Sequence, residues 1–453
     1  MLPSTAHEDF RTSFWPRVRE FAVPASMIET ATARRLAGDW AGACAAAGFD
    51  VDLDLRAEAR GHGPELASAI RADLRALAPD LLRWHMPRVA PDGLLRPGLT
   101  LTLARYEADG DTMHLVARTP PAWADAGQRI SLALWSRSAS DAERHPHPRP
   151  NRRFRLDLHR HLWDAGRSGE LRERAGAGPP GAQPPWEGAG LLTSLPYGCA
   201  LDRWTAEARL LLGDEGRAAG RVLVRCGGRR RLLLELAADD DSVRTTTPAG
   251  TTATLPVLPD AATWVLPDLE LLRTGTIGPD RLHPLVAAAL APGHVAGGPP
   301  RTSERTGQPR LVECRGARHR IGLVDGVLVP LDHDAAEIRR EELLVALTGT
   351  PLPCLRAIDE AHRRPHCLEG VRERLVHGDT AGALAVVEEL LGPEALLRTG
   401  PLRDELEAAA LRRVTYGLFR AGLTGPGPAW FRPRLNGRHS HDHRTHPRHA
   451  TAR

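Results

Sequence analysis

The chain has 453 residues, a formal net charge of +4 at pH 7 and a hydrophobic content of 42%. One hydrophobic core rarely serves a chain of this length, so two or three domains are expected. The sequence has no run of 18 apolar residues and the N-terminus has no apolar segment of signal-peptide length, so we expect a cytoplasmic protein with no membrane partner.

The basic side chains are all arginine, because lysine does not occur in the sequence. This bias indicates a GC-rich coding sequence of the kind found in actinobacteria, and arginine abundance is then weak evidence for phosphate recognition. Six cysteines are scattered without a CxxC pair, which argues against a zinc cluster and against a dense disulfide framework. We therefore expect free, mostly buried thiols, no bound metal and no cofactor.

The first predicted domain, residues 1–175, is α+β. Ser26 with Glu29 forms a capping-box pattern at the start of a helix. Gly38 is placed to end that helix and Asp39 to cap the next one. The other expected elements are an edge strand at 49–55, an amphipathic helix at 65–77 and an antiparallel meander over 99–136.

A stretch dense in arginine and histidine follows at residues 143–163. On a strand, Asp157, His159 and His161 would project from one face at period two, as in a metal or acid–base cluster. A solvent-exposed polar strand face explains the same spacing. These three residues form a candidate polar cluster to which the sequence assigns no metal.

Residues 176–190, rich in glycine and proline, are predicted to be a linker to a central β-rich α+β domain over 191–333. Two β-structures are expected there, a hairpin at 221–236 and a three-stranded meander at 310–330. They place Cys226 and Cys314 at equivalent positions. Each cysteine is a candidate nucleophile if neighbouring arginines lower the pKa of its thiol, and otherwise a small buried side chain.

Residues 334–423 are predicted to be an array of helical hairpins. Asp334 is placed to cap the first helix, Gly378 to end a later one and Asp379 to cap its successor. The expected helices are 335–348, 352–361, 367–376, 380–391 and a long one from Pro401 that Gly422 ends. Its apolar face is predicted to be Leu402, Leu406, Ala410, Val414 and Leu418.

The segment GDTAGAL followed by VVEELLGP resembles the second-helix half of a tetratricopeptide repeat. Gly378, Asp379, Ala383 and Leu391 match positions where that family needs a turn or a close helix contact. The resemblance covers residues 371–393, and a weaker one lies at 34–48. It implies binding to other proteins and brings no catalytic residues.

The last segment, residues 424–453, is predicted to be a disordered tail, because it has almost no aliphatic side chains. Its six arginines and one aspartate give it a net charge of +5, so residues 1–423 sum to −1. Any general affinity for polyanions is therefore expected in the tail. The candidate nucleic-acid-binding residues are Arg432, Arg434, Arg438, Arg444 and Arg448.

No P-loop, dinucleotide-binding glycine motif, HExxH or GxSxG is found in the sequence. An enzyme is therefore not the favoured class, and the catalytic residues of one would be unknown. We expect a protein-interaction or adaptor protein that binds a protein partner through helical hairpins. The alternatives are a nucleic-acid-associated protein that binds through its tail and an enzyme of unrecognised type.

Overall fold

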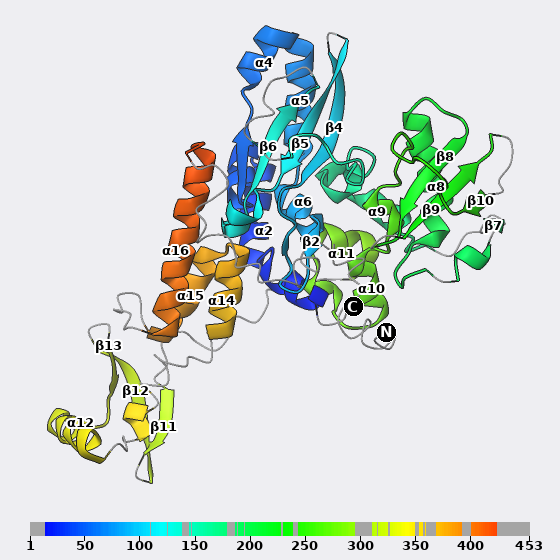
Figure 1. Cartoon of the computed structure of the whole chain (residues 1–453). Coiled ribbons are helices and arrows are strands. Elements are labelled where there is room, and N and C mark those ends of the chain that lie inside the picture. The colour runs from blue at the N-terminus through cyan, green and yellow to red at the C-terminus, as the bar shows by residue number, and fades with distance from the viewer. Residues whose placement is uncertain are drawn as a thin grey trace. The chain divides into compact units, whose positions relative to one another are not determined.

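The computed structural model of the chain combines helices with mostly antiparallel sheets, which confirms the predicted α+β class (Figure 1). Within the described ranges, no helix is both long and apolar enough to cross a membrane. The chain divides into two compact units. The larger unit contains residues 1–296 and 421–453, and the smaller unit contains residues 297–420. The structure describes residues 14–423 except 109, 125, 138–144, 146, 179–185, 188, 194, 228–229, 239–242, 295–309, 315, 325–326, 349–352, 357, 359–367 and 392–399.

The first sheet of the larger unit has four strands, β1 (Phe49–Asp52), β4 (Thr100–Ala108), β5 (Asp111–Arg118) and β6 (Ile130–Trp135). Their order is β1-β6-β5-β4, and the last three form the predicted antiparallel meander. β1 is the predicted edge strand, and it pairs parallel with β6, so that Phe49 lies opposite Ile130. A short ribbon joins β2 (Arg88–Val89) to β3 (Leu94–Leu95).

From residue 14 onward, the helices described before the meander of the larger unit are residues 14–21, α2 (Ala25–Leu36), α3 (Trp40–Ala46), α4 (Leu55–His62), α5 (Pro64–Ala76) and α6 (Pro79–His85). α5 buries Leu66, Ile70 and Leu74, the apolar face that their spacing predicts. The capping box predicted at Ser26 is wrong, because the N-cap of α2 is Pro24, two residues earlier, and it makes no side-chain cap bond.

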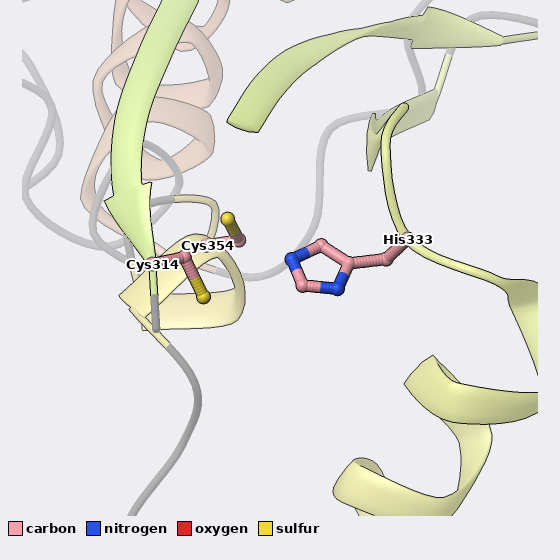
Figure 2. Close-up of side chains that lie close together, drawn as sticks. All are labelled: Cys314, His333 and Cys354. Carbon is pink, nitrogen blue, oxygen red and sulfur yellow. The ribbon is translucent and has the colours of Figure 1, made fainter. Parts of the chain in front are cut away.

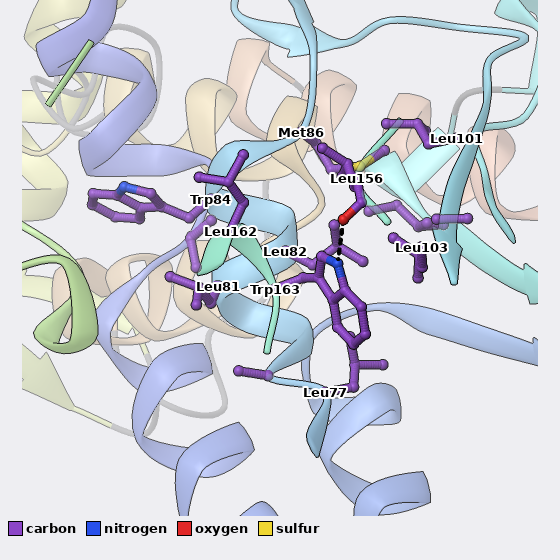
Figure 3. Close-up of a cluster of buried hydrophobic side chains, with 14 of the residues drawn as sticks. Leu77, Leu81, Leu82, Trp84, Met86, Leu101, Leu103, Leu156, Leu162 and Trp163 are labelled. Atoms are coloured by element: carbon purple, nitrogen blue, oxygen red, sulfur yellow. Dashed lines mark hydrogen bonds between the residues drawn. The ribbon is translucent and has the colours of Figure 1, made fainter. Parts of the chain in front are cut away.

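The core of the larger unit is built around α6 and the segment after the meander (Figure 3). Leu81 and Leu82 of α6 and Trp163 are all fully buried. The indole N–H of Trp163 donates a hydrogen bond of 2.9 Å to the carbonyl oxygen of Leu156, which satisfies its one polar group in an apolar environment. Trp163 thereby fixes the segment from Leu156 onward against the strands.

The second sheet has the strands β7 (Trp186–Glu187), β8 (Gly220–Arg225), β9 (Arg231–Leu236) and β10 (Val243–Thr246) in the order β7-β10-β9-β8. Its core packs on α8 (Leu201–Asp214), and β8 and β9 are the predicted hairpin. β7 lies inside the predicted linker 176–190 and pairs parallel with β10. This part of the predicted linker is a strand because Trp186 packs its large apolar side chain near α8, with its ring centroid 6.4 Å from that of Trp204.

Helices from the predicted central domain also enter the core of the first one. Leu269 of α10 (Pro267–Arg273) and Val286 of α11 (Pro284–Leu290) belong to the same buried cluster as the first sheet. The predicted boundary at 176–190 therefore separates the two sheets but does not separate two compact units. The larger unit also contains the short helices α7 (Leu171–Arg174) and α9 (Asp260–Thr263) and the 3-10 turns Ala122–Ala124, Ala126–Gln128, Arg160–Leu162, Ala165–Glu170, Ala189–Leu191 and Pro279–Arg281.

In the smaller unit, the predicted three-stranded meander is confirmed as β11 (Arg310–Cys314), β12 (Ala317–Val324) and β13 (Val327–Pro330). Gly316 adopts a φ of +78°, which the turn after β11 needs. The predicted type I′ turn at 325–326 lies outside the described residues. Asp334 precedes α12 (Ala335–Thr348), and its carboxylate accepts a 3.3 Å bond from the Ala336 N–H, as an N-cap does.

Three further helices follow, α14 (Leu368–His377), α15 (Thr380–Leu391) and α16 (Pro401–Arg420). The helix predicted at 352–361 is described as helical at 353–356 and 358. On α16, Leu402 is buried, whereas Val414 and Leu418 of the same predicted face are 59% and 36% exposed. The predicted face is wrong because a strict spacing of four advances 400° per step and drifts by about 40° each time.

The helix turns at Asp39 and Asp379 have the same local geometry. Asp379 accepts the Gly382 N–H at 2.9 Å and Arg374 at 2.9 Å, as Asp39 accepts the Gly42 N–H at 2.8 Å and Arg34 at 3.2 Å. Asp379 is 8% exposed. These contacts confirm both predicted caps, and the glycine before each aspartate has a positive φ.

We expect Asp379→Ala to lower the free energy of unfolding by about 0.5–2 kcal/mol, because the substitution removes the acceptor for an otherwise unpaired helix N–H. Asp39→Ala should lie at the lower end of that range, since its ion pair with Arg34 is more exposed. Urea denaturation followed by circular dichroism measures both. Glu388→Ala, on the exposed part of α15, is the control, and an equal loss in that variant would contradict the capping role.

Candidate functional site

Two cysteines and a histidine from three separate elements of the smaller unit lie together. Cys314 ends β11, His333 follows β13, and Cys354 lies on the helical turn 353–356. One ligand atom of each residue lies within 4.8 Å of the other two. Figure 2 shows the His333 ring pointing toward the two cysteines. Both cysteines have 0% exposure, so the sulfur atoms lie in the interior of this part of the unit.

The imidazole of His333 is held from one side. Its Nδ1 lies 3.4 Å from a carboxylate oxygen of Glu337 in the first turn of α12, and the His333 side chain is 3% exposed. Its Nε2 is buried without a hydrogen-bond partner. The ring of His319 stacks on that of His333 with centroids 4.2 Å apart, which keeps the imidazole from rotating. A neutral histidine held in this way presents a lone pair on Nε2.

The carboxylate next to His333 in the sequence, that of Asp332, is already paired with an arginine. Asp332 forms a 2.6 Å ion pair with Arg320 and accepts the backbone N–H of the same residue. These hydrogen bonds lower the pKa of Asp332 to about 2. Burial, together with the hydrogen bond that the protonated Cys354 thiol makes with Cys314, raises the pKa of Cys354 to about 11. Without a bound cation, Cys354 is therefore protonated.

Local spacing in the sequence does not reveal this arrangement. Cys314, His333 and Cys354 are far apart in the sequence, and a CxxC search cannot detect ligands that a sheet and two loops bring together. One local signal was available: His333 directly precedes the N-cap Asp334, and the first turn of the following helix supplies Glu337.

The predicted strand face of Asp157, His159 and His161 does not form. The described chain has turns from 156 to 158 and a 3-10 helix at Arg160–Leu162. The cause is the hydrogen bonding of Leu156 and Asp157, whose N–H groups both donate to the carbonyl oxygen of Thr102 and turn the chain there. The three side chains consequently belong to two different networks.

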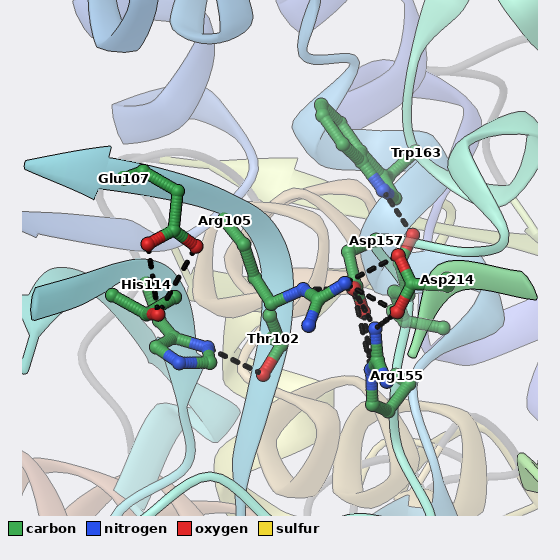
Figure 4. A network of polar contacts seen from close by, with 10 residues as sticks. Thr102, Arg105, Glu107, His114, Arg155, Asp157, Trp163 and Asp214 are labelled. Atoms are coloured by element: carbon green, nitrogen blue, oxygen red, sulfur yellow. Dashed lines mark hydrogen bonds and ion pairs between the residues drawn. The ribbon is translucent and has the colours of Figure 1, made fainter. Parts of the chain in front are cut away.

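Asp157 lies in an arginine–carboxylate network with Arg105, Arg155 and Asp214 (Figure 4). Arg155 bridges Asp157 and Asp214 at 2.5 and 2.7 Å, and Arg105 pairs with both carboxylates. Although burial opposes its ionisation, these arginines lower the pKa of Asp214. Burial, with Arg105 nearby, lowers the pKa of His114 to about 4. The network joins β4 to the end of α8 and is a structural contact.

His159 and His161 are buried, with ring centroids 5.7 Å apart. Arg174 approaches Nδ1 of His159 at 3.1 Å and pairs with Glu207 at 2.8 Å. Because arginine only donates, Nδ1 of His159 accepts and its proton lies on Nε2. Burial lowers the pKa of His161 well below its ordinary value. These contacts connect the 3-10 helix to α8 and explain the histidines structurally.

The two candidate nucleophiles lie in different surroundings. Cys226 follows β8 and is fully buried. A hydrogen bond with Cys199 and burial both raise the pKa of its thiol, the opposite of what a nucleophile needs. Cys314 belongs to the cluster with His333. The five described cysteines, Cys44, Cys199, Cys226, Cys314 and Cys354, are free thiols.

The remaining candidate residues, Arg432, Arg434, Arg438, Arg444 and Arg448, lie outside the described residues. Comparisons of the chain with protein-family models, with curated proteins and with solved structures found no match. Functional conclusions therefore depend on the chain's own residues.

Proposed function

We propose that the helices α14, α15 and α16 form a docking module for a protein partner. The supporting observation is a row of exposed apolar side chains on α16: Leu411 is 47%, Val414 59% and Leu418 36% exposed. Their spacing of three and four residues places them on one face of the helix. A row of exposed apolar side chains is typical of a protein-interaction site.

The opposite face of α16 anchors the helix. Leu402 and Ala409 belong to a buried cluster with Val371 of α14 and Val387 of α15. Leu402 and Leu411 are nine residues apart, about 900° around the helix, and therefore on opposite sides. The core contacts hold α16 in place without using the row formed by Leu411, Val414 and Leu418, which we call the α16 stripe.

The geometry favours an amphipathic helix as the part of the partner that is recognised. A row at spacings of three and four accepts the matching ridge of a second helix, whose apolar residues repeat at the same interval. The tetratricopeptide-like turn at Gly378 and Asp379 agrees with this proposal, since that family implies binding to proteins.

The test is capture of partners from an extract of the source organism by the full chain and by the double variant Val414→Asp/Leu418→Asp. We expect binding of the specific partner to weaken at least ~10-fold, because each buried apolar side chain of this size contributes about 1.5–3 kcal/mol. The matched controls are Leu343→Asp on α12 and Leu210→Asp on α8, which are 65% and 49% exposed and lie outside the stripe. They should capture the partner as the unchanged chain does.

Equal capture by the stripe variant and the unchanged chain would overturn the proposal. Sedimentation of the purified chain shows whether the stripe instead joins two copies, since the double variant would then abolish a dimer. The basic tail is the alternative binding element. A nuclease-treated extract and a chain ending at Leu423 test it: capture that needs nucleic acid and the tail would replace the docking function with nucleic-acid association.

A further inference from the structure

We propose that Cys314, His333 and Cys354 bind a zinc ion. The donor set consists of two cysteine sulfurs and one imidazole nitrogen, the ligand types that Zn²⁺ takes in proteins. All three side chains are largely or fully buried, and one ligand atom of each lies within 4.8 Å of the others. Within the described part of the chain, these three residues are the group of His, Cys, Asp or Glu side chains that lie close enough together to hold a metal ion.

The orientation of His333 supports the assignment independently of the sulfurs. A metal-bound histidine usually gives its second ring N–H to a carboxylate, which fixes the tautomer and directs the other nitrogen at the metal. His333 has this arrangement, because Nδ1 faces Glu337 and Nε2 is buried without a partner. A buried nitrogen that lacks a partner is unfavourable, and coordination to a metal would satisfy it.

The packing around the thiols gives a third argument. The buried apolar cluster next to β11 contains Cys314 and Cys354, with Val312 and Leu355 packed against it. The two cysteines are therefore the buried residues at the centre of this small cluster, the position that larger apolar side chains occupy in the core of a larger fold. A metal that ties the end of β11 to the loop after β13 and to the turn 353–356 supplies the cross-link that such a core provides in larger folds.

The spacing of the ligand atoms is compatible with tetrahedral coordination. With Zn–S distances of about 2.3 Å, two sulfurs at tetrahedral positions lie about 3.8 Å apart, and the ligand atoms here lie within 4.8 Å of one another. Binding releases the protons of both thiols to solvent and leaves the imidazole neutral, so the two thiolates balance the charge of Zn²⁺. A tetrahedral ion has one further position, which a donor such as water can occupy.

The Cys199 and Cys226 pair is a matched control within the same chain. Cys226 directly follows the first strand of a hairpin, and its thiol is hydrogen-bonded with the thiol of Cys199. No histidine or carboxylate completes a metal-binding group there within the described residues. The double variant Cys199→Ser/Cys226→Ser therefore removes two buried thiols and should leave zinc binding unchanged.

The experiment measures zinc content of the full chain by elemental analysis, and the spectrum after cobalt substitution. We expect one zinc per chain in the unchanged protein and in the control, and roughly a tenth of that or less in Cys314→Ala/Cys354→Ala. The cobalt form should show a sulfur-to-metal charge-transfer band, which separates thiolate coordination from metal held by the histidines of the tail. Circular dichroism reports whether each variant folds.

Glu337→Gln keeps all three ligands and tests the proposal even if the cysteine variants unfold. We expect its zinc affinity, measured by competition with a chelator, to fall about 10–100-fold, because the carboxylate no longer orients His333. The proposal is overturned by zinc content that does not depend on Cys314 and Cys354, by a cobalt spectrum without the sulfur band, or by a disulfide between Cys314 and Cys354 in the protein as purified.

Discussion

Asp268→Ala is expected to lower the free energy of unfolding by about 3–5 kcal/mol, because it leaves a buried arginine without its counter-charge. Arg19 pairs with Asp268 at 2.7 Å, and the two side chains are 2% and 0% exposed. The other carboxylate oxygen of Asp268 accepts the indole N–H of Trp84 at 3.1 Å. The alanine variant therefore removes the acceptor of two buried donors at once.

The guanidinium of Arg19 also lies 4.3 Å from the centre of the Trp84 ring and donates to the Trp84 carbonyl oxygen at 2.7 Å. These contacts fix the arginine in place, so it cannot reach solvent when Asp268 is lost. The measurement is urea denaturation followed by circular dichroism. Thermal melting supplies a second measure.

Glu20→Ala is the matched control, since Glu20 pairs with Arg281 at 3.3 Å with about half of each side chain exposed. That exposed pair should contribute about 0.2–1 kcal/mol, because solvent screens it. A loss in Asp268→Ala no larger than the loss in Glu20→Ala would show that the buried pair does not stabilise this helix arrangement.

Trp163→Ala should also cost about 3–5 kcal/mol of unfolding free energy, because it leaves a cavity in a close-packed core. Trp163 has 0% exposure and lies among leucines of α6 and β4 (Figure 3). The indole N–H of Trp163 donates a hydrogen bond of 2.9 Å to the Leu156 carbonyl oxygen, and the guanidinium of Arg160 lies 4.4 Å from the centre of the Trp163 ring. The substitution therefore also releases the turn that leads to His159 and His161.

Trp163→Phe separates the two contributions. It keeps an aromatic ring in the core but leaves the Leu156 carbonyl oxygen without its donor, so we expect an intermediate loss of about 1–3 kcal/mol. Leu36→Ala, at a side chain that is 75% exposed, is the control and should stay within about 0.5 kcal/mol of the unchanged chain. A Trp163→Ala variant as stable as this control would contradict the core role.

The sequence predicts those parts of the fold that local chemistry decides. The helix predicted at 380–391 has the same bounds as α15, because Asp379 caps it and Gly378 ends the helix before it. The meander of β11, β12 and β13 follows from alternating side chains and tight turns. The tetratricopeptide-like family assignment and the protein partner remain predictions.

Long-range contacts decided the features that the sequence did not predict. Nothing local to Asp157 indicates that Thr102, on a distant strand, turns the chain there. The sequence did not predict the outward face of α16, because apolar residues at a strict spacing of four move gradually around the helix and do not stay on one face. The cluster of Cys314, His333 and Cys354 depends on the register of a sheet and the paths of two loops, which no short motif encodes.

The parallel pairing of β1 with β6 has a consequence for the order of folding. The contacts of β4 with β5 and of β5 with β6 close short loops. The contact between Phe49 of β1 and Ile130 of β6 closes a much longer loop, because β4 and β5 lie between these two residues in the sequence. Contacts that close long loops carry a larger entropic cost and form more slowly. The meander is thus the natural nucleus of this sheet, and β1, with the helical hairpin that precedes it, joins an edge that already exists.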